Sequence, residues 1–246
     1  MKNTVIIIPT RLSAQRFPNK PLAEINNIPM IIHVLNRAKE SKAGEVLVAT
    51  PDNKIIEIIK KNGGKAILTK PEHSSGSDRI YEAYTKELIN KENFDLIINL
   101  QGDMPNIKPD SILKLVMFMR KSNCDIGTLA SNIKDKKDMQ NPNIVKVQVN
   151  EKLEVDSFLN AKDFFRIKNG TNNQKIYHHI GIYAFTNTAL KKYVKLSRSR
   201  LEIDRKLEQM RAMENNLSIK VGLCDSKPLG VDTEDDLKKV REEMRI

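Results

Sequence analysis

The chain has 246 residues, with 42 lysines and arginines against 31 aspartates and glutamates, so its formal net charge is +11. This length can bury a sizeable core. Its longest apolar runs, such as Val5–Ile8, are far shorter than the roughly 20 residues that a membrane span needs. The first run stops at Pro9, too early for a signal-peptide core. Cys124 and Cys224 lie in no metal-binding motif, and we expect reduced thiols in a cytoplasmic protein.

The positive charge has two interpretations. Lysines spread over solvated helix faces account for most of it. The alternative is attraction of an anionic partner, such as a nucleotide, an acidic sugar or nucleic acid. Net charge does not separate the two, and no basic stripe interleaved with aromatic residues favours nucleic acid. We therefore expect no nucleic-acid partner.

Short apolar runs alternate with amphipathic segments in the first half of the chain. The pattern predicts strands at 5–8, 45–49, 66–68 and 95–100, and helices at 30–41, 53–62 and 77–90. The run Val5–Ile8 does not alternate with polar residues, as in strands buried on both faces. Strand–helix alternation predicts a parallel sheet covered by helices on both sides.

The second half is less regular. The pattern predicts strands at 126–131, 145–149, 179–185 and 219–224, and helices at 202–214 and 233–245. Thr233 or Asp232 is expected to cap the last helix. The segment 160–174, which holds Gly170 and several asparagines, predicts a flexible lobe. We expect one α/β domain over residues 1–246, with an inserted lobe for dimerisation and sugar binding around 150–210.

Parallel sheets bind ligands beyond the carboxyl ends of their strands, so the loops there are candidate sites. The loop after Ile8 carries Arg11, Arg16 and Lys20 within a dozen residues, and such cations suit a triphosphate. The loop lacks the P-loop and dinucleotide patterns. The simpler interpretation is an exposed basic loop.

Two further segments follow predicted strands. The run His73–Arg79 offers small hydroxyl residues and a glycine at a helix start, which fits either a nucleotide contact or a plain helix cap. Asp103 follows a buried strand, and Asp232 near the C-terminus is a second carboxylate. Two carboxylates with substrate phosphates are a usual Mg²⁺ arrangement, although a single such aspartate is often only a cap.

A series of motifs runs in fixed order along nearly the whole chain. It comprises Ile7–Arg11 with Arg16, Pro18 and Lys20–Leu22, then Pro29–Val34, Val48–Thr50 with Asp52, His73–Arg79, Gln101–Asp103 with Pro105, Asn141–Asn143 with Val145–Val147, His179 with Gly181–Tyr183, Leu207–Arg211, and Gly230–Thr233 with Asp236-Leu237. In order and spacing, these motifs resemble those of the 3-deoxy-D-manno-octulosonate (Kdo) cytidylyltransferases, also called CMP-Kdo synthetases.

The resemblance implies a fold and an activity. The fold would be a three-layer, Rossmann-like nucleotidyltransferase α/β fold with a mostly parallel, mixed sheet of about seven strands. The activity would be Mg²⁺-dependent transfer of CMP from CTP to the anomeric hydroxyl of Kdo, with release of pyrophosphate, for lipopolysaccharide synthesis. The family also implies a homodimer in the cytoplasm.

The resemblance also assigns roles to residues. The nucleotide would contact Pro9, Thr10, Arg11, Arg16, Lys20, Ser75 and Gln101. The sugar acid would contact Arg79, Gln101, His179, Tyr183, Glu208 and Gln209. Asp103 and Asp232 would hold Mg²⁺ and, with Lys20 and Arg16, form the catalytic set.

Three positions depart from the family pattern. Met104 stands where the family usually has glutamate, the segment 158–162 lacks the usual Ser-Arg, and Ser77-Asp78 replaces Thr-Glu. Two alternatives therefore stay open. One is a cytidylyltransferase for a related acid, of the sialic acid type or 8-amino-Kdo. The other is a non-catalytic, nucleotide-binding paralogue.

Overall fold

A computed structural model of the chain describes residues 3–13, 16–87, 94–167 and 175–245. The chain divides into two compact units, Met1–Leu113 with Pro228–Ile246, and Lys114–Lys227; we call them the first and second units. The second unit contains the predicted 150–210 lobe, whose role in dimerisation and sugar binding stays a prediction. In the described ranges, no helix is both long and apolar enough to cross a membrane.

The first unit contains a parallel sheet, as predicted. Its strands lie in the order β5-β4-β1-β6, with bounds β1 Thr4–Pro9, β4 Glu45–Thr50, β5 Lys65–Leu68 and β6 Leu96–Leu100. Its helices are α1 Met30–Glu40, α2 Asn53–Lys61, α3 Gly76–Glu87 and α9 Glu234–Glu243. Residues 88–90, which the prediction included in the helix of α3, lie outside the described residues.

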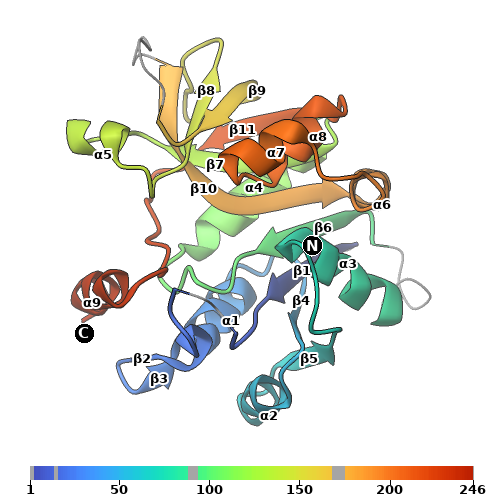
Figure 1. Ribbon diagram of the computed structural model, residues 1–246, viewed down its shortest axis with the longest axis vertical. Coiled ribbons are helices and arrows are strands. Elements are labelled where there is room, and N and C mark those ends of the chain that lie inside the picture. The colour runs from blue at the N-terminus through green and yellow to red at the C-terminus, as the bar shows by residue number, and fades with distance from the viewer. Residues whose placement is uncertain (1–2, 14–15, 88–93, 168–174, 246) are drawn as a thin grey trace. The chain divides into compact units, whose positions relative to one another are not determined.

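The strand order explains where ligands can approach the first unit. The chain moves from β1 outward to β4 and β5, and then returns to the other side of β1 as β6. Right-handed crossovers therefore put α1 and α2 on one face of the sheet and α3 on the other, as Figure 1 shows for α1 and α3. Because the strand order reverses between β1 and β6, their carboxyl ends form the crevice in which such sheets bind ligands.

The end of the chain folds back onto the start of the first unit. After β1 come a short 3₁₀ helix, Lys20–Leu22, and a hairpin of β2 Glu24–Ile25 and β3 Ile28–Pro29. Val231 and two residues of α9 pack with Ile25 and Met30 in one buried apolar cluster. Thr233 caps α9 through a reciprocal box with Asp236, which confirms one of the two predicted caps. This packing fixes Asp232 near β1 and β6.

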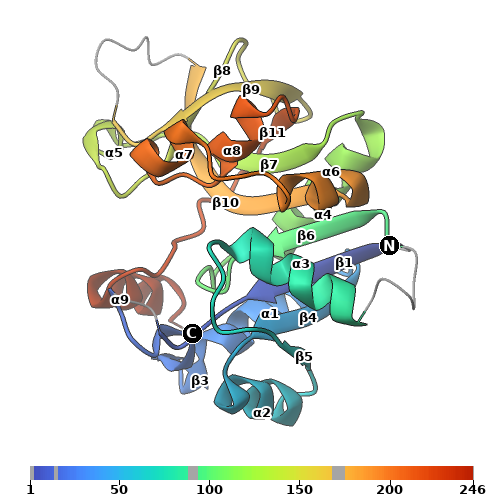
Figure 2. The ribbon, with the colours of Figure 1, turned by 45° about the vertical axis from the view of Figure 1, so that its right-hand side comes forward.

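The second unit contains a mixed sheet in the strand order β10-β7-β11-β9-β8 (Figure 2). The strands are β7 Ile126–Ser131, β8 Lys146–Val149, β9 Phe158–Phe165, β10 Ile176–Thr186 and β11 Ile219–Leu223. β11 is parallel to β7, and the pairings of β10 with β7 and β9 with β11 are antiparallel. The helices are α4 Pro109–Lys121, which begins in the first unit, α5 Lys136–Gln140, α6 Asn187–Tyr193, α7 Arg200–Arg205 and α8 Gln209–Glu214.

Three predictions about this architecture need correction. Four strands in the first unit's sheet and five in the second unit's are described, more than the seven expected, although the fold class is the same. Residues 160–165 of the predicted flexible lobe 160–174 belong to strand β9, which lies between β8 and β11; residues 168–174 of that lobe lie outside the described part. The predicted helix 202–214 is two helices, because Lys206 adopts a left-handed backbone with φ 54°.

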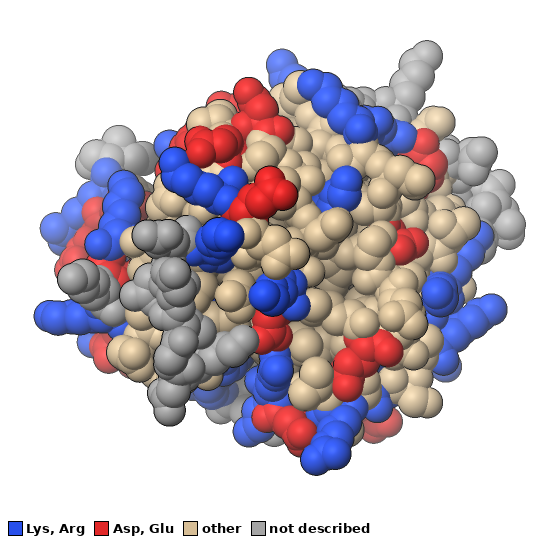
Figure 3. Space-filling view, turned by 90° about the horizontal axis from the view of Figure 1, so that it is seen from above, with Lys and Arg blue, Asp and Glu red and all other residues tan. Residues whose placement is uncertain are grey.

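The surface charge is mixed on the face that Figure 3 presents. Blue lysine and arginine side chains alternate there with red aspartate and glutamate side chains around uncharged areas. Interspersed signs are typical of a solvated surface, whereas nucleic-acid binding uses a continuous basic stripe. On this face, the charge pattern therefore favours the simpler interpretation of the +11.

Candidate active site

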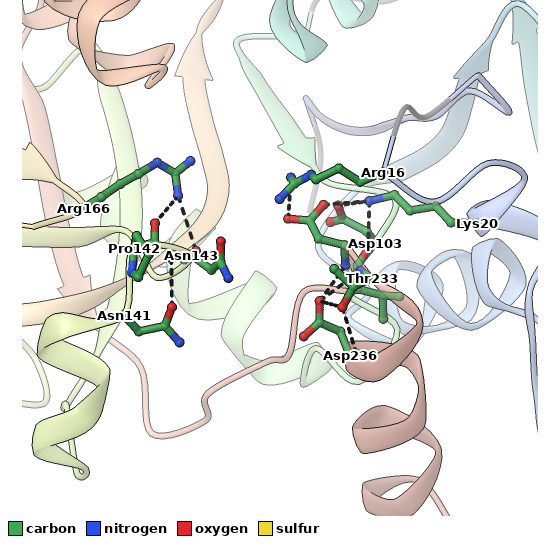
Figure 4. A network of polar contacts seen from close by, with 11 residues as sticks. Arg16, Lys20, Asp103, Asn141, Pro142, Asn143, Arg166, Thr233 and Asp236 are labelled. Carbon is green, nitrogen blue, oxygen red and sulfur yellow. Dashed lines mark hydrogen bonds and ion pairs between the residues drawn. The ribbon is translucent and has the colours of Figure 1, made fainter.

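Two carboxylates and two cations meet beside the carboxyl ends of β1 and β6. The Lys20 Nζ lies 2.8 Å from Asp103 Oδ2 and 3.1 Å from Asp232 Oδ1. It also donates to the Val231 carbonyl oxygen at 2.8 Å. Arg16 pairs with the other oxygen of Asp232 at 2.9 Å. Figure 4 shows Arg16 and Lys20 of the loop after β1 close to Asp103 of the loop after β6, with Thr233 and Asp236 at the start of α9 near them.

Backbone contacts hold the two aspartates in place. The Val231 N–H donates to the Asp103 carbonyl oxygen at 2.9 Å, and the Asp232 N–H donates to the Asp236 carboxylate at 3.2 Å. Asp103 thus follows a buried strand, while Asp232 immediately precedes a capped helix. The two carboxylates are 129 residues apart in sequence, counted from their numbers, and are positioned independently of the cations that they bind.

The environment keeps Lys20 charged. Burial alone would lower the pKa of its ammonium, but Asp103 and Asp232 outweigh this effect and raise that pKa above its ordinary value. Arg16 is more exposed, with 63% of its side chain accessible, so its ion pair contributes little to stability. Arg16 therefore remains available to an anionic ligand, whereas Lys20 is already part of the framework.

The donor set fits a hard divalent cation. Mg²⁺ prefers carboxylate oxygens, and it typically takes one or two of them and completes its shell with water and substrate phosphates. Asp103 and Asp232 already converge on one positive group, the Lys20 ammonium. Among the residues that the structure describes, no three acidic, histidine or cysteine side chains form a cluster suited to a metal, so this pair would depend on substrate oxygens for further ligands.

The start of the loop after β1 is tied to the neighbouring strand. Thr10 N–H donates to the Ala49 carbonyl at 3.0 Å, and Leu12 N–H donates to Asp52 Oδ2 at 2.9 Å. Arg11, between them, is exposed. Residues 14–15 of this loop lie outside the described part. Asp52 thus positions this loop, and it belongs to the motif series although no role in the site was predicted for it.

The first turn of α3 lies close to Pro9 and Gln101. A Cβ atom added at Gly76 would stand 3.4 Å from Pro9 Cγ and 3.5 Å from Gln101 Nε2. The Gln101 amide donates to Asn99 Oδ1 at 3.0 Å, and the Ser75 hydroxyl donates to Asp78 at 2.9 Å. The structure therefore brings together Pro9, Ser75 and Gln101, which the resemblance assigns to the nucleotide.

Arg79 lies farther along α3 and is directed into its own unit. Only 3% of the residue is exposed. Its guanidinium donates to Thr69 Oγ1 at 2.5 Å and to the carbonyl oxygens of Lys70 and Pro71 at 2.9 and 3.1 Å. Burial and the nearby charge of Arg11 lower the pKa of Arg79. Both terminal nitrogens thus bind protein oxygens, and its contact with the sugar acid stays a prediction.

The second unit brings together most of the residues assigned to the sugar. The rings of His179 and Tyr183 lie 5.4 Å apart. Burial is the main cause that raises the pKa of Tyr183, and the charge of Glu208 adds to it, so these two side chains interact electrostatically. Gln209 follows Glu208 at the start of α8 and is buried. Their role in binding a sugar stays a prediction.

His179 is neutral, and its contacts select one tautomer. Burial, with a smaller effect of His178, lowers the pKa of His179 to about 3. Its Nε2 lies 2.9 Å from Thr128 Oγ1, which itself lies 2.7 Å from the Ile182 carbonyl. Because the hydroxyl has one proton and directs it to that carbonyl, it accepts from an Nε2–H. The Nδ1 of His179 is then a hydrogen-bond acceptor.

Comparison with known proteins places this arrangement in a family. A family model described as cytidylyltransferase matches residues 5–219. A relative from Brucella anthropi, named 3-deoxy-manno-octulosonate cytidylyltransferase, is 43% identical over 97% of this chain and 95% of its own length. The Brucella canis protein of the same name is 42% identical over 97% of this chain and 94% of its own length.

Solved structures agree with these sequence relatives. A structure of CMP:2-keto-3-deoxy-manno-octonic acid synthetase complexed with CTP matches with a TM-score of 0.88 and 35% identity, covering 99% of this chain and 98% of the other. The 4-diphosphocytidyl-2C-methyl-D-erythritol synthase of Anaerococcus prevotii shares the fold alone, with a TM-score of 0.67 and 14% identity over 99% and 98% of the two chains. Together, the family model and the full-length identity establish that this chain belongs to the family of 3-deoxy-manno-octulosonate cytidylyltransferases.

Proposed function

We propose that this protein transfers the cytidylyl group of CTP to the anomeric hydroxyl of Kdo and releases pyrophosphate. The observation that carries this proposal is the convergence of Lys20, Asp103 and Asp232 beside the ends of β1 and β6. Full-length similarity to proteins named for this reaction supports the choice of both substrates. By the same similarity, we propose that the product serves lipopolysaccharide synthesis in the cytoplasm and that the enzyme is a homodimer.

In the proposed reaction, the sugar hydroxyl attacks the α-phosphorus in line with the leaving pyrophosphate. A bond forms between the sugar oxygen and phosphorus as the bond to the bridging oxygen breaks; the hydroxyl proton passes to water, and pyrophosphate leaves with the bridging oxygen. Such transfer depends on positioning and on neutralising oxygen charge, and it needs no covalent nucleophile. Arg11 and Arg16 are proposed to bind the phosphates, with Lys20 neutralising charge beside them.

Asp103 and Asp232 are the proposed ligands of Mg²⁺. When bound, the ion would neutralise phosphate charge and lower the pKa of an oxygen that it coordinates. Lys20 contacts both carboxylates, so they already converge on one positive group. Pro9, Thr10, Ser75 and Gln101 are proposed to contact the nucleoside.

The proposed sugar contacts are His179, Tyr183, Glu208 and Gln209, together with Gln101 and Arg79. The neutral His179 offers an Nδ1 acceptor to a sugar hydroxyl, as its Thr128 contact requires. Tyr183, whose pKa is raised by burial, keeps its phenolic proton and serves as a donor. A neutral acceptor and donor of this kind suit the hydroxyl groups of a sugar.

The test of the sugar is pyrophosphate release from CTP and Mg²⁺ with Kdo, 8-amino-Kdo and a sialic acid in parallel. We expect Kdo to give a kcat/KM at least ~10-fold above either alternative acid, because correctly placed hydrogen-bonding groups discriminate strongly between sugars. Turnover with a sialic acid and none with Kdo would contradict the proposal.

Met104 provides a test of the non-catalytic alternative. Its side chain is buried, with 5% of the residue exposed, and the carboxylates and cations assemble without a glutamate there. In an active enzyme, we expect Met104→Glu to change kcat by less than about threefold. A wild-type protein without turnover that gains it through Met104→Glu would favour the paralogue instead.

A further inference from the structure

A set of polar contacts outside the assigned nucleotide residues ties α3 to the segment that precedes it. This segment, Thr69–His73, connects β5 to α3. Arg79 donates to the Thr69 hydroxyl at 2.5 Å and to two of the segment's carbonyl oxygens. Three residues later, Glu82 accepts the Lys70 N–H at 2.9 Å and lies 2.5 Å from His73 Nε2. One face of α3 thus holds the segment along its length.

Glu82 binds more partners than an ordinary surface glutamate. Only 12% of its side chain is exposed, and Lys86 pairs with it from the next turn of α3 at 2.5 Å. Burial raises the pKa of Glu82, but hydrogen bonds from Lys86, the Lys70 N–H and His73 outweigh it and lower the pKa to about 2. The carboxylate is therefore ionised at all working pH values.

The segment leads directly into the first turn of α3. Its other end is anchored by the Thr69 N–H, which donates to the Thr50 carbonyl at 2.9 Å. Two residues beyond His73 is Ser75, and Gly76 follows, where an added Cβ would stand 3.4 Å from Pro9 Cγ. A change in the path of Thr69–His73 therefore moves Ser75 relative to Pro9 and Gln101.

We propose that Glu82 is a positioning residue for the nucleotide: through Lys70 and His73 it holds the Thr69–His73 segment so that Ser75 and the first turn of α3 meet CTP. This inference rests on the proposed function and deepens it. If the contacts of Glu82 only stabilised the fold, their loss would lower the free energy of unfolding, and the folded variant would bind CTP as before. If the contact positions the nucleotide site, its loss weakens CTP binding by a protein that is still folded.

The experiment compares Glu82→Gln and Glu82→Asp with Glu45→Gln. Glutamine keeps the size of the side chain but turns an amide N–H₂ toward donors, whereas aspartate keeps the charge. Glu45, on β4, pairs with Lys65, so Glu45→Gln is the matched loss of an ion pair in the same unit. Calorimetric CTP titrations with Mg²⁺ are combined with Kdo-dependent pyrophosphate release, and urea unfolding establishes that each variant is folded.

We expect Glu82→Gln to raise the Kd and the KM for CTP about tenfold or more while kcat changes less than about threefold, because a small misplacement of binding groups has large effects. Glu82→Asp should recover part of the loss, and Glu45→Gln should match wild type. If Glu82→Gln does not fold, His73→Asn takes its place, and we expect it to raise the Kd for CTP about threefold.

The two proposals fail in different ways. If wild-type protein binds CTP and turns over, and a folded Glu82→Gln binds CTP as well as Glu45→Gln does, the role of Glu82 is overturned and the proposed function stands. If wild-type protein neither binds CTP nor releases pyrophosphate, the proposed function is overturned, and this inference with it.

Discussion

Lys20 connects three segments of the first unit through a single side chain. Its ammonium contacts Asp103, Asp232 and the Val231 carbonyl, so one side chain joins the loop after β1 to the loop after β6 and to the C-terminal segment. The two aspartates make up for the cost of burying the ammonium, as its raised pKa indicates. Lys20, Asp103 and Asp232 thus join three segments of the first unit.

Substitution of Asp232 tests the role of the two carboxylates in catalysis. We expect Asp232→Asn to lower kcat/KM at least about 100-fold, because the amide loses the charge that binds a cation. Folding should change little, since 46% of the Asp232 side chain is exposed and Lys20 keeps Asp103 and a carbonyl. The measurement is pyrophosphate release at varied Mg²⁺.

The matched control for this change is Asp235→Asn. Asp235 lies in the first turn of α9, three residues after Asp232, and pairs with Lys238 at 3.0 Å with 80% of its side chain exposed. This variant should keep wild-type kcat and KM. Equal activity of the two variants would remove Asp232 from the catalytic set.

At the scale of elements, α7 and α8 are joined by a buried ion pair. Arg211 donates to both oxygens of Glu202 at 2.7 and 2.8 Å, and both side chains are almost fully buried. Burial raises the pKa of Glu202, but Arg211 and Arg198 lower it below its ordinary value. Because Glu208 and Gln209 begin α8, this pair also orients residues that are proposed to bind the sugar.

Arg211→Met tests the contribution of that pair. The variant leaves a buried carboxylate without its main partner, so we expect the free energy of unfolding to fall by about 3 kcal/mol. Urea denaturation measures this change. The double variant Arg211→Met/Glu202→Gln removes the buried charge and should recover part of the loss; a double variant as unstable as the single one would contradict the explanation.

The elements also define what the sequence could predict. Apolar periodicity located β1, α1, β4 and α2 to within one or two residues, because the apolar residues of each element recur with the period of the strand or helix that buries them. The break at Lys206 was missed, since the apolar spacing continues through it and a left-handed residue leaves no pattern when it is not glycine. Strand β9 was missed because its polar residues Asn160 and Asp163 pair with β11 and β8, a tertiary effect that outweighs local propensity.

The candidate site was predictable to a different degree. Asp103 was identified by its place after a buried strand, and Asp232 was named as a second carboxylate that would complete a Mg²⁺ site. Because 129 positions separate the two, local pattern could not show that they lie together. The Glu82 contacts were not predicted, because a glutamate inside a helix is ordinary until its partners are known. Arg79 was expected beside the sugar, and its contacts with Thr69–Pro71 depend on the path of a loop that local pattern does not define.

At the scale of the whole molecule, two buried histidines make stability depend on pH. Burial is the main cause that lowers the pKa of His178 to about 4 and that of His179 to about 3, from an ordinary value of 6.5. Between the lowered pKa values of the folded protein and the ordinary value of 6.5, the unfolded chain binds more protons than the folded one, so the free energy of unfolding rises with pH. The stability that the two neutral histidines contribute is fully present above about pH 6.5 and is lost as the pH falls toward 4.

This dependence can be measured with His178, which has no assigned role in binding. Each neutral histidine adds on the order of 1 kcal/mol per pH unit to the slope below pH 6. We expect the free energy of unfolding to fall between pH 6 and pH 5, and His178→Gln to remove about half of that fall. Urea denaturation at both pH values is the measurement, and an unchanged slope in the variant would show that His178 titrates normally in the folded protein.

The central claim is that this chain joins CMP to Kdo. The most direct measurement is ³¹P NMR of CTP, Kdo and Mg²⁺ with catalytic amounts of the protein. The proposal predicts that the CTP signals give way to pyrophosphate and a new phosphodiester in equal amounts, only when Kdo is present. Loss of CTP without Kdo, with CMP as the product, or unchanged CTP after prolonged incubation with Kdo, would contradict it.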